Sequence, residues 1–127
     1  MTESPEPARR VRLSRTPPDV PLIQLDALAD PGARNFVLQI GEDLFHGFVV
    51  RQGREVRGYV DRCPHAGLPL AQHLDQYLTP DGAMIVCAWH GALFEPAEGR
   101  CVGGPCANAR LTPWPVEVRD GMVRTAP

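Results

Sequence analysis

The sequence reads CPHAGLPL over residues 63–70 and CAWHGALF over residues 87–94, so one cysteine-to-histidine pattern occurs twice. The histidines are His65 and His90, and each lies two or three positions after its cysteine. A zinc site usually takes two cysteines from one C-x-x-C turn and two histidines from a helix. Because each stretch here mixes a thiol with an imidazole, the pattern favours a site with two metal ions. If the two stretches lie side by side, both cysteines can hold one metal and both histidines the other.

The residues around these motifs predict an all-β fold, because short apolar stretches alternate with turn residues. Only residues 68–78 have an apolar spacing that fits a helical turn or two. Asp120-Gly121 is a two-residue hairpin signal, since glycine accepts a positive φ. The strands expected from the pattern are residues 35–40, 44–51, 55–60, 83–87, 116–119 and 122–124.

Length and composition limit the class of protein. The chain has 127 residues, of which 43% are hydrophobic and 22% charged, as in one globular domain that buries a core without disulfides. Its 13 basic residues are all arginine and are scattered, and the net charge is −2, so we expect no nucleic-acid partner. No apolar stretch approaches the roughly 18 residues that a membrane-spanning helix needs, so we expect no membrane partner.

The first 19 residues differ in composition from the rest. They contain four prolines and four arginines with few aliphatic side chains, which predicts a flexible arm at residues 1–19 before a single domain at residues 20–127. Arg9-Arg10 is similar to the start of a twin-arginine export signal, but polar residues and prolines replace the apolar region that should follow. We therefore expect a cytoplasmic protein.

The C-x-H and C-x-x-H motifs resemble those of the Rieske [2Fe–2S] family, and the likeness extends through Gly103-Gly104-Pro105 over residues 20–125. The resemblance implies a Rieske-type antiparallel fold of three β-sheets with a small cluster-binding subdomain. In this chain the subdomain would be formed by three loops, at residues 63–68, 87–92 and 103–106.

The resemblance also implies one [2Fe–2S] cluster as the cofactor. Its inner iron would be held by Cys63 and Cys87, and its outer iron, near the surface, by His65 and His90. The glycines that follow the histidines, Gly67 and Gly91, would let backbone N–H groups approach the bridging sulfides.

Departures from the family pattern predict a low reduction potential. High-potential members carry an extra cysteine in each ligand loop, where this chain has Leu68 and Trp89. They also place a serine and a tyrosine after the second histidine, where this chain has Ala92 and Phe94. Because both hydroxyl donors to sulfur are missing, we expect a potential of about −150 mV. Leu68 and Trp89 are expected to be buried, and they would then shield the metal site from water.

Other residues invite a functional interpretation that their spacing does not support. Cys101 and Cys106 lie beside the third loop, and buried or loop thiols are a better interpretation than a disulfide. His46 and His73 belong to no ligand-spaced pair, so we assign them structural or surface roles. Arg62 is adjacent to Cys63 and fits compensation of the reduced cluster's charge, a partner contact or a solvated side chain.

The most favoured function is a soluble one-electron carrier that passes electrons from a reductase to an oxygenase-type enzyme. We expect no catalysis by the chain itself, because an oxygenase iron needs two histidines and a carboxylate and only His46 and His73 remain. One alternative is the small Rieske-like subunit of a larger reductase, such as a nitrite reductase. The other is a zinc-stabilised interaction module, which would fold with zinc alone.

Overall fold

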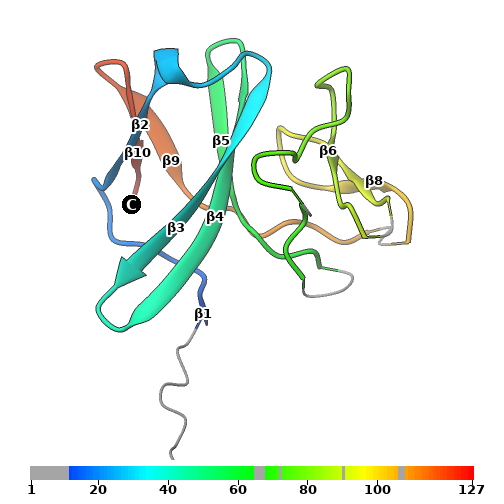
Figure 1. Cartoon of the computed structure of the whole chain (residues 1–127), viewed down its shortest axis with the longest axis horizontal. Coiled ribbons are helices and arrows are strands. Elements are labelled where there is room, and N and C mark those ends of the chain that lie inside the picture. Colours follow the sequence, from blue (N-terminus) through cyan, green and yellow to red (C-terminus); the bar gives the residue numbers. More distant parts are fainter. Residues whose placement is uncertain (1–11, 65–67, 72, 90, 106–107) are drawn as a thin grey trace, which may run out of the picture.

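A computed structural model describes residues 12–64, 68–71, 73–89, 91–105 and 108–127. In these residues the chain forms ten strands in three sheets, and Figure 1 shows the three sheets side by side. The expectation of an all-β fold with three sheets is confirmed. One pair departs from the antiparallel rule, because β1 (Arg12–Leu13) runs parallel to the start of β4.

The central sheet is built around β4 (Asp43–Gln52). It pairs antiparallel with β3 (Gly32–Ile40) on one side and with β5 (Glu55–Val60) on the other. The turns fall at Gly41 and Gly53, whose φ angles are +64° and +66°, a conformation that glycine adopts without strain. β5 then leads into the first cysteine motif.

Two smaller sheets flank the central one. The terminal sheet contains β2 (Pro21–Gln24), β9 (Val116–Arg119) and β10 (Met122–Thr125), with β10 in the middle. The loop sheet contains β6 (Ile85–Val86), β7 (Leu93–Phe94) and β8 (Cys101–Gly103), with β7 in the middle. The second cysteine motif is the connection from β6 to β7.

Strand β4 is buried on both faces because it separates two hydrophobic cores. Phe45 and Val49 belong to the core shared with the terminal sheet, which includes Trp114. Phe48 and Val50 point to the other face and belong to the core shared with the loop sheet. The second core contains both Cys63 and Cys87, so the face of β4 that carries Phe48 and Val50 belongs to the same core as the candidate site.

The described part of the expected arm, residues 12–19, is held against the domain. The indole N–H of Trp114 donates to Oγ1 of Thr16 over 2.9 Å, and Oγ1 of Thr125 donates to the carbonyl of Pro17 over 2.7 Å. Asp19 forms an ion pair with Arg119 at 2.8 Å. These contacts are long-range, so the local composition gives no sign of them. Residues 1–11 lie outside the described part of the chain.

The prediction of a helical turn within residues 68–78 is wrong. The one helical segment that the structure describes is a 3-10 turn at Leu25–Ala27, and no described helix is long and apolar enough to cross a membrane. Residues after the first motif instead bond to other segments: the N–H of Leu70 donates to Asp61, and the carbonyl of Tyr77 accepts from the N–H of Val86. Tertiary partners therefore use the groups that a helix would need.

Candidate metal centre

The two candidate cysteine ligands occupy equivalent places at the ends of strands. Cys63 follows β5 by three residues, and Cys87 comes directly after β6. Both side chains are fully buried, at 0% exposure. His65 and His90 lie outside the described residues, as does Gly67. The structure therefore describes the thiol half of the expected ligand set.

Each cysteine loop is closed by the same hydrogen bond. The N–H of Cys63 donates to the carbonyl of Leu68 over 2.7 Å, and the N–H of Cys87 donates to the carbonyl of Ala92 over 2.8 Å. In the second loop the N–H of Gly91 also donates back to the carbonyl of Cys87 over 2.9 Å. Gly91 has a φ of +71°, so this position needs a residue that tolerates the left-handed region.

Direct hydrogen bonds join the two cysteine stretches, residues 63–70 and 87–94. The N–H of Ala88 donates to the carbonyl of Leu70 over 2.7 Å. The indole N–H of Trp89 donates to the carbonyl of Pro69. The described parts of the two stretches therefore lie side by side, which is the arrangement that a shared site for two metals requires.

The third expected loop packs on the second. Gly103 of β8 pairs with Leu93 of β7. Gly104, with a φ of +88°, lies so close to the second loop that a Cβ there would be 2.8 Å from Cα of Ala92. Cys101 is a buried thiol whose Sγ donates to the carbonyl of Gly103 over 3.2 Å, while Cys106 lies outside the described residues.

A buried polar network supports the first loop, and none of its members was among the site residues expected from the sequence. Asp61 accepts a hydrogen bond from the N–H of Leu70 at 2.9 Å and another from the Tyr77 hydroxyl at 2.8 Å. Asn35 of β3 donates from Nδ2 to the Tyr77 oxygen over 2.7 Å and to Asp61 over 3.3 Å.

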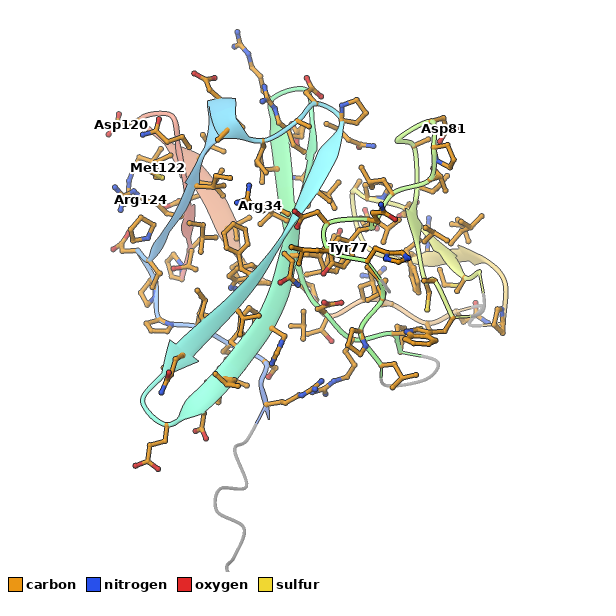
Figure 2. The ribbon with its side chains drawn as sticks, viewed as in Figure 1. Arg34, Tyr77, Asp81, Asp120, Met122 and Arg124 are labelled. Atoms are coloured by element: carbon orange, nitrogen blue, oxygen red, sulfur yellow. The ribbon has the colours of Figure 1, made fainter. Side chains whose placement is uncertain are left out.

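Burial, and then the charge of Asp61, raises the pKa of Tyr77 above its ordinary value. Tyr77 belongs to the linker, the stretch of chain between the two cysteine loops, and Figure 2 shows it on the side of the linker that faces the central sheet. The one sequence signal that could have found it is a carboxylate directly after the apolar pair Tyr59-Val60 that ends β5.

The expectation that Leu68 and Trp89 are buried is wrong. Their exposed fractions are 43% and 41%, and the indole N–H of Trp89 donates to the carbonyl of Pro69. Val102 of β8 is 50% exposed. Arg62 and His73 are exposed and His46 is half-buried within β4, which agrees with the structural or surface roles assigned to the two histidines.

The described residues fit an iron–sulfur group. Two buried thiols lie in one apolar core, and thiolate sulfur is the donor that iron–sulfur clusters require. Thiolates in such a core are costly unless a metal neutralises them. No set of three metal-ligating side chains occurs among the residues that the structure places, which include only two of the four expected ligands.

Comparisons with known proteins agree with this fold. The ferredoxin of carbazole 1,9a-dioxygenase from Nocardioides aromaticivorans IC177 is 24% identical with a TM-score of 0.67, over 88% of this chain and 99% of that one. The ferredoxin of Sphingomonas yanoikuyae B1 is 25% identical with a TM-score of 0.63, over 86% and 98% of the two chains. The terminal oxygenase of carbazole 1,9a-dioxygenase from Novosphingobium sp. KA1 is 22% identical with a TM-score of 0.69, but only 30% of that chain is covered, against 89% of this one. A search of curated proteins finds no match.

A family model described as the Rieske [2Fe-2S] domain matches residues 20–125, which is nearly the whole chain. The match includes both cysteine loops, the third loop and every described strand except β1. One [2Fe–2S] cluster is the cofactor that this domain binds. The chain belongs to the Rieske [2Fe-2S] domain family.

Proposed function

We propose that this protein is an electron carrier that accepts one electron from a reductase and passes it to a terminal oxygenase, without catalysing a reaction itself. The observation that carries the proposal is the nearly end-to-end match to a ferredoxin, over 88% of this chain and 99% of the ferredoxin. Another solved structure that matches this chain is a complex of a reduced oxygenase with an oxidised ferredoxin, at 25% identity and a TM-score of 0.65. A partner of the same kind is therefore the natural acceptor here.

We propose Cys63 and Cys87 as the ligands of the inner iron and His65 and His90 as those of the outer iron. The burial of both thiols supports the first assignment, and the hydrogen bonds between the two loops support a shared site. When bound, the cluster supplies a one-electron couple. The chain's own loops hold the thiols in a dry core and fix the backbone around them, which favours fast electron transfer because little has to move.

The exposed side chains beside the loops favour a docking role. Leu68 and Trp89 lie in the two ligand loops, three positions after His65 and one position before His90 in the sequence, and both remain more than two-fifths exposed. Arg62, also exposed, adds a positive charge next to Cys63. Apolar and aromatic side chains with an arginine are typical of transient protein contacts. A cytoplasmic location is part of the proposal, because that compartment keeps thiols such as Cys101 reduced.

The test combines spectroscopy with matched cysteine variants. Protein isolated without oxygen should contain iron and sulfide in equal amounts, and after reduction it should give the EPR spectrum of a Rieske cluster. Cys63→Ser and Cys87→Ser should abolish that spectrum, whereas Cys101→Ser should keep it, although Cys101 is also buried. Loss of the spectrum in all three variants, or in none, would contradict the ligand assignment.

The electron-transfer role needs a separate measurement. Reduced protein mixed rapidly with an oxidised Rieske oxygenase should transfer its electron, and the transfer should slow when Trp89 is replaced by alanine. Isolation only with a large catalytic partner, without transfer to an oxygenase, would instead indicate a subunit of a reductase. Colourless protein that folds with zinc alone would refute the carrier function.

A further inference from the structure

We propose that Asp61 is a positioning residue that sets the reduction potential of this site, through a fixed negative charge behind the ligand loops. The inference deepens the proposed function and rests on it. Asp61 is none of the expected ligands. Among the described residues it is the one buried side chain that carries a carboxylate, and its exposed fraction is 6%.

The surroundings of Asp61 suit the ionised carboxylate. Three groups point hydrogen atoms at it: the N–H of Leu70 at 2.9 Å, the hydroxyl of Tyr77 at 2.8 Å and Nδ2 of Asn35 at 3.3 Å. An ionised carboxylate only accepts hydrogen bonds, so this set of donors satisfies it. None of the ion pairs in the described part of the chain includes Asp61, so no cation there cancels its charge.

Asp61 is linked to both ligand loops. It lies two residues before Cys63, and its own N–H donates to the carbonyl of His46 in β4 over 2.9 Å, which fixes it to the central sheet. Leu70, whose N–H it accepts, uses its carbonyl to accept the N–H of Ala88 over 2.7 Å. Ala88 directly follows Cys87. The carboxylate therefore lies two hydrogen bonds away from the second loop and two residues away from the first cysteine.

A fixed charge in this place acts on reduction through electrostatics. The electron supplied by the upstream reductase adds one negative charge to the site, and a nearby buried carboxylate repels it more strongly than an exposed one would. Repulsion destabilises the reduced state and so lowers the potential. This cause is independent of the missing hydroxyls at Ala92 and Phe94.

The primary test compares Asp61→Asn with Asp75→Asn by redox titration. Asparagine keeps the size of the side chain and the bond to Leu70 while removing the charge. We expect Asp61→Asn to shift the reduction equilibrium at least tenfold toward the reduced form, which is about 59 mV for a one-electron couple. Asp75 is the matched control: its side chain is 35% exposed and lies 3.9 Å from Arg34, its φ of +65° suits asparagine, and the asparagine oxygen can still accept the N–H of Asn35 that Asp75 accepts over 2.7 Å. Its variant should shift the equilibrium less than twofold.

Tyr77→Phe separates charge from packing. It removes one donor to Asp61 but keeps the carboxylate, so the site should experience more negative charge and the potential should fall. Opposite shifts in the two variants support the proposal, and shifts in the same direction overturn it as a general loosening of the loops. If Asp61→Asn yields protein without a cluster, Tyr77→Phe decides alone, and an unchanged or raised potential overturns the proposal.

The two proposals fail in different ways. A wild-type protein without the Rieske EPR spectrum refutes the proposed function. If the wild-type protein gives that spectrum but Asp61→Asn changes the equilibrium constant for reduction less than twofold, only the role of Asp61 is refuted.

Discussion

The ring of Tyr77 stacks on the ring of Phe48, with centroids 4.1 Å apart and planes 4° from parallel. Tyr77 belongs to the linker between the two cysteine loops, and Phe48 to the central strand β4. The stack therefore fixes the linker to the sheet, and the hydroxyl of the same tyrosine reaches Asp61 at the base of the first loop. Through Tyr77, the packing of the core and the position of the site depend on each other.

Replacing Phe48 by alanine should destabilise the protein by about 3–5 kcal/mol, because it leaves a cavity under Tyr77 in a fully buried place. Urea unfolding measures the change. The control is Val37→Ala on the neighbouring strand β3, whose side chain is 52% exposed, and it should change the free energy of unfolding by no more than about 0.5 kcal/mol. If Phe48→Ala lowers the free energy of unfolding as little as Val37→Ala does, the stack contributes little to stability.

Several strands could be predicted because they alternate regularly and end at glycine turns. The expected strands at residues 55–60 and 116–119 coincide with β5 and β9. β7 and β8 contain only two and three residues, too few to show a period, and they were missed. The expected strand at residues 83–87 shrinks to Ile85–Val86.

The motif in the sequence identified the family, but the support of the site could not be predicted from it. Asn35, Asp61 and Tyr77 are brought together from β3, the end of β5 and the linker. Such a network depends on long-range contacts, and its members are ordinary polar residues whose spacing matches no motif. The wrong expectation for Trp89 has the same origin, since its exposure depends on where Pro69 lies.

Gly104→Ala should disturb the second ligand loop. The added Cβ would meet Cα of Ala92 at 2.8 Å, closer than real Cβ contacts allow. Gly121→Ala is the matched control, because Gly121 has a similar φ of +77° but a Cβ added there would meet nothing within 4 Å. Both variants carry the backbone penalty of about 1 kcal/mol or more, but only Gly104→Ala should also lose bound iron. Equal iron content in the two variants would contradict the prediction.

The reduction potential should be about −150 mV, as expected for a site without hydroxyl donors. Ala92 and Phe94 are both fully buried, so water does not replace the missing donors easily. Phe94→Tyr should therefore raise the potential by roughly 60 mV, which is a tenfold change in the equilibrium constant. Redox titration followed by circular dichroism measures both values. A wild-type potential above about +100 mV would refute this account.

Alkaline pH should unfold the protein through its two tyrosines. Burial raises the pKa of Tyr59 from 10.0 to about 12, and the Tyr59 hydroxyl donates to the carbonyl of Pro96 over 2.6 Å. Because the unfolded chain loses this proton first, the stabilisation from Tyr59 is complete below pH 10 and is lost as the pH rises toward 12. The free energy of unfolding should fall by about 3 kcal/mol, and Tyr77 adds to this fall in the same direction.

Ultraviolet absorbance should show tyrosinate appearing together with unfolding, and Tyr59→Phe should weaken the dependence of the free energy of unfolding on pH. Titration of either tyrosine near pH 10 in the folded protein would contradict this prediction.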